Sequence, residues 1–227
     1  MAGALMYAVL WAALNVLRLI GWFRWRLVGA ERLPPRESGG MVLVMNHIGW
    51  LDIPVIGSLL PYKYRLSWLA KSELFENPIV GWWFRTMNVI PIKRGKRDLA
   101  AMEAAIQALR DGAVLLIFPE GTRSRNGRLQ TGRGGAVRMA MQAGVPIVPL
   151  AITGTERGLR GTLLRKPVVL TVGQPYRVEL TADGKIPPDL MEQLTSEMML
   201  SIATLLPPEQ RGVYGPLLET QRESATS

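Results

Sequence analysis

The chain has 227 residues, 48% of them hydrophobic, which is enough to bury one sizeable core, and its length favours one domain with one active site. Cysteine is absent and histidine occurs once, so this chain alone cannot build disulfides, thiolate nucleophiles or metal sites that need cysteine or two imidazoles. The 27 Lys and Arg residues outnumber the 18 Asp and Glu residues, and the formal charge of +9 favours an anionic partner, either nucleic acid or acidic lipid headgroups.

The first 26 residues form a hydrophobic segment. Residues 1–17 are apolar apart from Asn15, and the apolar run resumes after Arg18. No basic region precedes the run and no clear cleavage site follows it, which argues against a signal peptide. Arg18 also interrupts the roughly 20 apolar residues that a membrane-spanning helix needs.

Aromatic residues beside arginines are typical of the boundary between lipid and water, and this segment contains Trp11, Trp22, Phe23 and Trp25. We therefore expect residues 1–26 to include a membrane-interfacial helix that lies in one leaflet, on the cytoplasmic face of the cell membrane. A helix buried in the protein core is the alternative.

From Gly39 onward, short β-rich runs alternate with helical stretches, which predicts an α/β fold: a three-layer single domain over residues 27–206, with a central mixed sheet flanked by helices. The expected strands are residues 41–45, 66–70, 89–92, 114–118, 145–153 and 168–172. The expected helices are residues 50–60, 98–112 with Asp98 as N-cap, 135–143 and 190–205. Beyond Pro207 the chain becomes polar, and we expect a mobile tail over residues 207–227.

The only histidine, His47, stands between a buried strand and a helix, where α/β folds tend to place their sites. Asp52 follows five residues later. A turn at His47 and a helix that begins near Asp52 would bring the carboxylate to the imidazole. Such a contact keeps Nδ1 protonated and leaves Nε2 free to take a proton from an alcohol, as a general base does. The alternative is a structural histidine, with Asp52 capping the start of the helix.

A second polar cluster follows the strand expected at residues 114–118. Arginines and the backbone N–H groups of a glycine-containing loop can hold a phosphate, and the segment contains Glu120, Gly121, Thr122, Arg123, Ser124 and Arg125. We expect Glu120 to pair with an arginine and orient it. Cations also end two other expected strands, at Lys71, Lys93 and Arg94. Single charges of this kind are usually solvated loop residues, but their repetition at successive strand ends indicates an anion site.

Other motifs are absent. The chain has no phosphate-binding G-x-x-x-x-G-K-[ST] loop and no G-x-S-x-G nucleophile elbow, and the glycines around Arg133 do not complete a dinucleotide motif. The basic residues do not alternate with aromatics on a nucleic-acid module, so no nucleic-acid partner is expected. An anionic membrane surface is the better partner.

Four blocks occur in one order along the chain: Asn46-His47 with Asp52, the stretch that ends at Arg94, Phe118 to Ser124, and Val145 to Pro149. Together they resemble the 1-acyl-sn-glycerol-3-phosphate (lysophosphatidic acid) acyltransferases of the glycerolipid acyltransferase superfamily, over Leu27 to Pro175. The resemblance implies direct attack of a lysophospholipid hydroxyl on an acyl thioester, either acyl-CoA or acyl-carrier protein. It implies no covalent acyl-enzyme, no metal ion and no cofactor apart from the acyl donor.

The same resemblance implies roles for individual residues. His47 is the base and Asp52 orients it. The residues implied in binding the acceptor phosphate are Lys71, Arg94, Glu120, Gly121, Thr122 and Arg123. The block around Pro146 is expected to shape the site or the acyl channel.

Two positions of the second block depart from the family, because Asn88 and Pro91 stand where a glycine and an aromatic residue are frequent. We expect acyl transfer to the sn-2 hydroxyl of lysophosphatidic acid, which gives phosphatidic acid in phospholipid biosynthesis. Another lysolipid, a glycolipid or an amino-acid lipid is the alternative acceptor. A thioesterase, in which water replaces the alcohol, and a catalytically silent lipid-binding module are the alternatives from other classes.

Overall fold

The computed structural model describes residues 2–93, 98–179 and 186–226. Within these residues, seven strands form one sheet in the order β1-β7-β6-β2-β5-β3-β4. β6 and β7 are antiparallel and the other neighbouring pairs are parallel, so the expected mixed sheet is confirmed. The strands are β1 (Trp25–Val28), β2 (Met41–Met45), β3 (Leu66–Lys71), β4 (Val89–Ile92), β5 (Val114–Ile117), β6 (Ile147–Thr153) and β7 (Val168–Val172).

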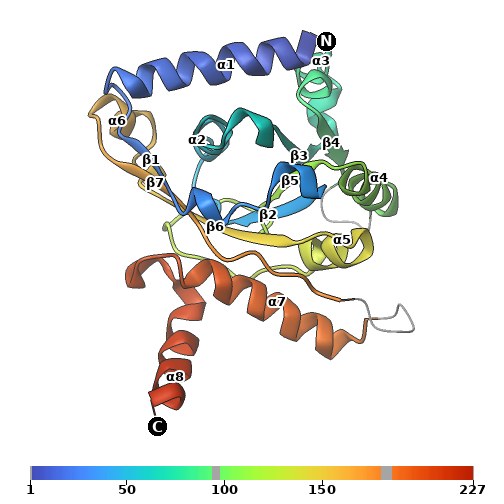
Figure 1. Cartoon of the computed structure of the whole chain (residues 1–227), viewed down its shortest axis with the longest axis vertical. Helices are drawn as coiled ribbons and strands as arrows, with labels where there is room; N and C mark the ends of the chain where they lie inside the picture. The colour runs from blue at the N-terminus through green and yellow to red at the C-terminus, as the bar shows by residue number, and fades with distance from the viewer. Residues whose placement is uncertain (1, 94–97, 180–185, 227) are drawn as a thin grey trace.

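Helices cover both faces of the sheet, which confirms the three-layer α/β fold (Figure 1). α2 packs on one face, with α1 outside it, and α4, α5 and α7 pack on the other. The helices are α1 (Ala2–Leu19), α2 (Asp52–Leu59), α3 (Pro78–Thr86), α4 (Leu99–Arg110), α5 (Gly135–Ala143), α6 (Gly158–Leu163), α7 (Pro188–Ala203) and α8 (Gly215–Thr226). Short 3-10 helices are η1 (Ala30–Arg32), η2 (Arg36–Ser38), η3 (Tyr62–Tyr64), η4 (Ser72–Phe75), η5 (Thr155–Arg157), η6 (Pro208–Gln210) and η7 (Gly212–Tyr214).

The core follows from the alternation of side chains along each strand. In β2, Val42 and Val44 join the cluster formed with α4, α5 and α7. Met41, Leu43 and Met45 point the other way and pack with α2. All five are fully buried. A central parallel strand that is buried on both faces needs a continuous apolar run, which is why β2 could be located from the sequence.

Local end signals also act as expected. The Asp98 side chain accepts a hydrogen bond from the backbone N–H of Ala101 at 3.1 Å and so caps α4. Gly144 ends α5 with a φ of 68°, in the left-handed region that glycine adopts without strain. The expected starts and stops of these two helices are therefore confirmed.

The N-terminal segment expected over residues 1–26 divides into α1 and the beginning of β1. Trp25 is buried, and its ring stacks on Phe23 with centroids 4.2 Å apart, so the expectation that it lies at a lipid boundary is wrong. β1 pairs with β7, with Trp25 opposite Val168. A four-residue edge strand next to an apolar helix gives no local signal, because its partner lies far along the chain.

α1 packs against α2 through its inner face. Asn15, the polar residue of the apolar run, is buried and donates from Nδ2 to the carbonyl of Ser58 at 2.9 Å. Trp11 donates from Nε1 to the carbonyl of Leu60 at 3.0 Å. Large apolar side chains on the outer face are exposed, namely Leu5, Val9, Val16 and Leu19. Among residues 2–93, 98–179 and 186–226, no helix has the length and apolar character needed to cross a bilayer.

The segment expected as a mobile polar tail is folded over its described part. Tyr214 is buried, and its hydroxyl accepts a hydrogen bond from the backbone N–H of Gly132 at 3.1 Å. Leu129 donates from its backbone N–H to the carbonyl of Gln210 at 2.9 Å, and Leu218 is also buried. The expectation is wrong because two apolar side chains among polar neighbours are enough to attach η7 and α8 to the core.

Candidate active site

Four neighbouring parallel strands bring the predicted residues to one edge of the sheet. β2, β5, β3 and β4 are adjacent and parallel, so their carboxyl ends lie on the same side. The residues that end or follow these strands are His47, Glu120, Lys71 and Lys93. Cations that recur along the sequence at strand ends therefore share one edge with the only imidazole.

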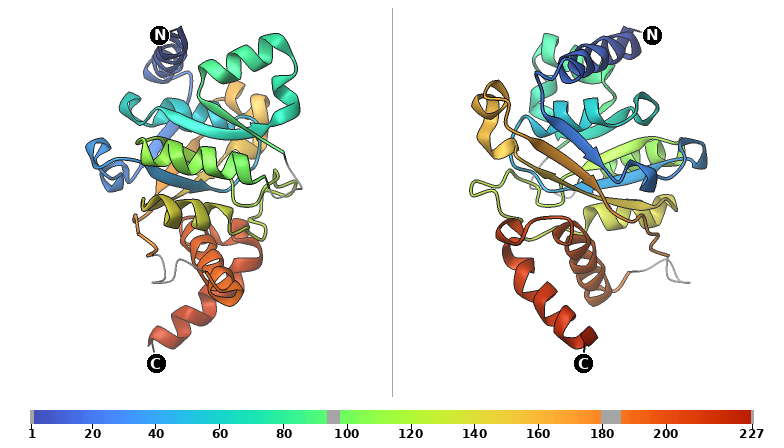
Figure 2. Two further views of the ribbon diagram at one scale, coloured as in Figure 1. Left: turned by 90° about the vertical axis from the view of Figure 1, so that its right-hand side faces the viewer. Right: turned by 60° about the vertical axis from the view of Figure 1, so that its left-hand side comes forward.

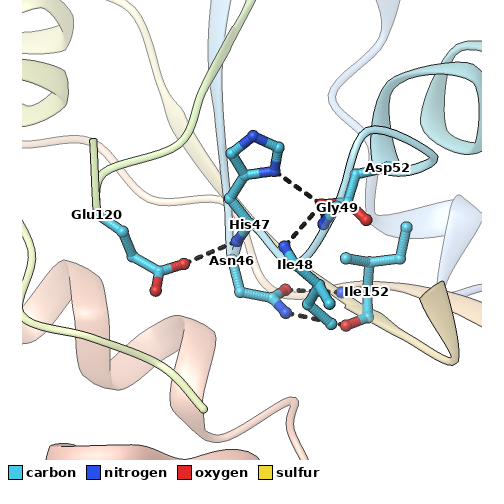
Figure 3. Close-up of polar contacts among 7 residues, drawn as sticks. All are labelled: Asn46, His47, Ile48, Gly49, Asp52, Glu120 and Ile152. Carbon is cyan, nitrogen blue, oxygen red and sulfur yellow. Dashed lines mark hydrogen bonds and ion pairs between the residues drawn. The ribbon is translucent and has the colours of Figure 1, made fainter. Parts of the chain in front are cut away.

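His47 and Asp52 form a direct pair (Figure 3). Asp52 is the first residue of α2 and is fully buried, and its Oδ2 lies 2.7 Å from His47 Nδ1. The same oxygen accepts hydrogen bonds from the backbone N–H groups of Ile48 at 2.7 Å and Gly49 at 2.9 Å. Asp52 thus both holds the turn and orients the imidazole. The alternative that it caps the start of the helix is wrong, because the N–H groups that it binds precede α2 and Leu51 is the N-cap residue. A buried carboxylate against Nδ1 favours the tautomer in which Nδ1 donates and Nε2 is free.

Phe118 fixes the plane of the imidazole. Its ring stacks on His47 with centroids 3.9 Å apart and an interplanar angle of 17°. The His47 side chain is 14% exposed, and its second ring nitrogen points away from Asp52 (Figure 3). The stacked ring and the Asp52 contact fix the orientation of the imidazole. Nε2 faces away from Asp52 and can accept a proton.

Glu120 supports the backbone of His47. It is buried, and Oε1 accepts a hydrogen bond from the His47 N–H at 2.7 Å while Oε2 accepts one from the Gln130 N–H at 3.0 Å. Among the described residues Glu120 forms no ion pair with an arginine, and both of its oxygens instead accept hydrogen bonds from backbone N–H groups. Burial raises the pKa of Glu120 above its ordinary value, and the two N–H donors act in the opposite direction.

The loop at residues 121–123 is anchored to His47 at both ends. Glu120 binds the N–H of His47, and the Ser124 N–H donates to the carbonyl of His47 at 2.7 Å. Gly121 has a φ of 70°, and a Cβ there would lie 3.3 Å from the guanidinium of Arg133. The positive φ therefore favours glycine here, and Arg133 packs closely against it.

Asn46 connects the site to the next strand. Its Nδ2 donates to the carbonyl of Ile152 at 2.9 Å, and its Oδ1 accepts from the Ile152 N–H at 2.8 Å (Figure 3). The amide replaces a backbone pair beyond the end of β2 and holds His47 against β6. The block around Pro146 lies at the amino ends of β2 and β6, at the opposite edge of the sheet from His47, where the Pro146 carbonyl accepts a hydrogen bond from the N–H of Val42. It positions β2 from within the sheet.

Comparison with known proteins gives the family. Residues 24–153, more than half of the chain, match the sequence model of the family described as Acyltransferase. The chain belongs to the acyltransferase family. This confirms the resemblance noted from the four blocks, all of which lie within the matched region.

Individual relatives agree with this assignment. A chloroplastic 1-acyl-sn-glycerol-3-phosphate acyltransferase of Brassica napus is 32% identical over 175 residues, which are 74% of this chain and 48% of the relative. A lyso-ornithine lipid O-acyltransferase of Pseudomonas aeruginosa is 35% identical over 148 residues, which are 63% of this chain and 56% of the relative. The chain spans about half the length of these curated relatives. The crystal structure of the 1-acyl-sn-glycerophosphate acyltransferase of Thermotoga maritima matches with a TM-score of 0.57 and 26% identity, over 77% of this chain and 68% of that one.

A cavity of about 220 Å³ lies against the imidazole. His47 and Gly121 line it, together with Lys93, one of the cations expected at strand ends, and Arg133, which the sequence analysis did not assign to the site. Leu69, Phe118 and Met139 supply apolar wall. The sequence analysis did not consider Arg133, because the glycines on either side of it were compared only with a dinucleotide-binding motif. A cation just before a helix start was the available signal, and only the fold shows that it reaches the cavity.

Other predicted residues lie beside the cavity rather than in its wall. Lys71, Thr122 and Arg123 are exposed and are not part of the lining within the described residues. Lys71 lies opposite Ile92, which does line it. Arg94 lies outside the described residues. In that described part, no three His, Asp or Glu side chains gather where a metal ion could bind.

Proposed function

We propose that the chain transfers a fatty acyl group from acyl-CoA or acyl-carrier protein to the sn-2 hydroxyl of lysophosphatidic acid, giving phosphatidic acid. The observation that carries the proposal is the buried Asp52 carboxylate that holds His47, the only imidazole, at the wall of a cavity with two cations. The family supports acyl transfer as the reaction. The Brassica napus relative supports lysophosphatidic acid as the acceptor.

In the proposed reaction, the acceptor hydroxyl attacks the carbonyl carbon of the thioester while Nε2 of His47 takes its proton. The new carbon–oxygen bond forms, the carbon–sulfur bond then breaks, and the imidazolium returns the proton to the leaving thiolate. Asp52 stabilises the imidazolium, since its Oδ2 lies 2.7 Å from Nδ1. An alcohol that is activated directly needs no covalent acyl-enzyme.

We place the acceptor phosphate beside the loop at residues 121–123. The hydrogen bonds of Glu120 and Ser124 keep this loop next to His47. Arg123 directly precedes Ser124, whose N–H donates to the His47 carbonyl. Arg133 lies against Gly121 and Lys93 lines the same cavity. A phosphate close to the base would position the hydroxyl of the same molecule for attack. We assign to this subsite Lys71, Arg94, Gly121, Thr122 and Arg123, with Glu120 as the residue that holds the loop in place.

Arg123→Ala should raise the KM for the acceptor by about tenfold or more, because a charge-assisted hydrogen bond to phosphate is worth on the order of 2 kcal/mol. The KM for the acyl donor should change less. Steady-state kinetics with each substrate varied in turn measure both values. Arg125→Ala is the matched control, because Arg125 is also exposed but lines a different hollow with Trp50 and Glu156. An acceptor KM unchanged in both Arg123→Ala and Arg94→Ala would remove these residues from the phosphate site.

We assign the acyl chain to a second cavity, of about 290 Å³, beneath α1. Its walls come from α1, α2, α3 and β3 and are almost entirely apolar, with Leu10, Trp11, Leu14, Ile53, Trp68 and Trp83 among them. A hydrocarbon chain leaves water favourably for such surroundings, at about 0.8 kcal/mol for each buried methylene. This chemistry supports a lipid substrate rather than a polar one.

We further propose that α1 holds the protein on the cytoplasmic face of an anionic membrane, with the exposed outer face in the lipid. Val9→Ser, Val16→Ser and Leu19→Ser combined should weaken binding to anionic vesicles by roughly tenfold or more, since each loses apolar area that the membrane would cover. These side chains point outward, so the melting temperature should stay unchanged, whereas deleting α1 would also uncover α2. Vesicle co-sedimentation measures the effect. If the triple variant sediments as strongly as the unaltered chain, α1 is not the anchor.

A second acceptor is favoured by one observation, the 35% identity to a lyso-ornithine lipid O-acyltransferase. An assay with a radiolabelled acyl thioester and a panel that includes lysophosphatidic acid and lyso-ornithine lipid tests both. We expect the label to appear in phosphatidic acid. Label that appears only in another acylated lipid would replace the acceptor, and label released only as free fatty acid would replace transfer by hydrolysis.

A further inference from the structure

α6, which follows η5, carries large apolar side chains that face solvent. Leu159, Leu163 and Leu164 are 54%, 65% and 60% exposed. The inner side of the helix is small, with Gly161 and Thr162 buried against the protein. Nothing in the acyl-transfer site uses these leucines. Leu159 and Leu163 of α6, with Leu164 at its C-cap, form an apolar patch rather than the scattered exposed residues that any protein surface has.

α6 lies beside the carboxyl end of α1 (Figures 1 and 2). Arg165 donates to the carbonyl of Gly21 at 2.6 Å, and Val168 donates to the carbonyl of Arg24 at 3.0 Å. The cause is the sheet, because β1 and β7 are parallel neighbours and the segments that lead into them must enter from the same side. The leucines of α6 therefore continue the exposed apolar surface of Leu19, Ile20 and Trp22. We call this combined surface, made of these three residues with Leu159, Leu163 and Leu164, the α6 corner.

Cations surround the leucines of α6. The segment at residues 156–166 contains one carboxylate, Glu156, and four exposed cations. The cations are Arg157, Arg160, Arg165 and Lys166. The core of a protein–protein interface is depleted in charged residues, whereas apolar side chains interleaved with Arg and Lys suit an anionic lipid surface. The charge pattern therefore selects a membrane over a protein partner or a second copy of the chain.

The opposite end of α1 has a similar flank. Ile79 and Trp82 of α3 are 77% and 53% exposed, and α3 contacts the amino end of α1, where a Cβ on Gly3 would lie 1.9 Å from the Thr86 carbonyl oxygen. With apolar flanks at both ends, α1 lies along the bilayer surface rather than pointing into it. α8 is at the far end of the molecule in every view (Figures 1 and 2).

We propose that the α6 corner is a second membrane-docking site, which inserts its leucines among the acyl chains of an anionic bilayer and places its arginines and Lys166 at the phosphates. The inference rests on the proposed function, in which the substrate is a membrane lipid. A single helix on a membrane can roll about its own axis. Membrane contacts at both ends of α1 would prevent this and fix how the sheet edge that bears His47 faces the bilayer.

The absence of cysteine from the chain allows a direct test. Leu163→Cys is labelled with a polarity-sensitive fluorophore and mixed with vesicles of phosphatidylcholine and phosphatidylglycerol. The emission should shift to the blue, as in an apolar medium. Leu217→Cys, on α8, is the matched control because Leu217 is also exposed, at 47%, and its emission should stay as in water. An unshifted label at 163 on vesicle-bound protein overturns the proposal, and so does a blue shift that needs no vesicles and grows with protein concentration.

A binding measurement gives the second arm. Leu159→Ser, Leu163→Ser and Leu164→Ser combined should lower vesicle partitioning by roughly tenfold or more, and added salt should weaken the binding of the unaltered chain. Leu99→Ser with Val213→Ser, two exposed apolar positions away from α6, should leave partitioning unchanged. Acyl transfer to a detergent-dispersed acceptor should be normal in the α6 variant. If the unaltered chain transfers no acyl group, the proposed function alone is refuted. The docking site is refuted if the α6 variant partitions as strongly as the unaltered chain, or if the unaltered chain does not partition onto vesicles.

Discussion

His47→Ala should lower kcat for acyl transfer by roughly 10²–10⁴-fold, the factor that a positioned general base typically supplies. An alcohol is a weak nucleophile toward a thioester until its proton is removed, and no other imidazole in the chain can take over. The KM values for donor and acceptor should change far less, because the cations that line the cavity are untouched. Single-turnover kinetics with saturating substrates measure the chemical step directly.

Asp52→Asn should also lower kcat, since an amide can hold the ring but stabilises the imidazolium poorly. Asp189→Asn is the matched control, because Asp189 also lies in the first turn of a helix but is exposed and far along the chain. The loss of kcat/KM at acid pH should follow the titration of the single imidazole signal in the NMR spectrum. A near-normal kcat in His47→Ala, or an acid limb unrelated to that titration, would exclude His47 as the base.

Glu120→Ala should lower the free energy of unfolding by roughly 3 kcal/mol, because it leaves the N–H groups of His47 and Gln130 without their acceptor, at about 1–3 kcal/mol each. The same change should lower kcat, since the backbone of His47 loses an anchor. Urea unfolding measures the first effect. Glu156→Ala is the matched control, because Glu156 also accepts from a backbone N–H, that of Gly154 at 2.8 Å, but is exposed. Equal losses in the two variants would show that the buried position of Glu120 has no special weight.

The raised pKa of Glu120 gives this prediction a pH dependence. A carboxyl whose pKa is higher in the folded than in the unfolded chain favours folding most when it is protonated. Its contribution is therefore complete below the ordinary glutamate pKa, about 4.3, and is lost as the pH rises through the raised value. Glu120→Gln stays neutral and should flatten that part of the profile of unfolding free energy against pH. A profile identical to that of the unaltered chain would mean that burial does not control this carboxyl.

Much of the fold could be predicted because its signals are local. The apolar run of β2, the Asp98 cap and the Gly144 stop each depend on residues close in sequence, and each element lies where it was expected. β1 could not be found in this way, because it becomes a strand only by pairing with β7. α6 and the folded C-terminal segment were missed for a similar reason, since exposed leucines and a few buried anchors look the same in sequence as a polar or irregular loop.

The sequence by itself determined the chemical parts of this protein: one imidazole, a carboxylate five residues later, and cations that recur where strands end. Tertiary structure decided which of them meet. Glu120 and His47 are 73 residues apart and are joined only because β2 and β5 are parallel neighbours. The same arrangement turned Glu120 from an expected arginine partner into a backbone anchor, and brought Arg133 into the cavity. Spacing along a chain limits contacts within one turn or helix, whereas contacts between strand ends depend on the order of strands in the sheet.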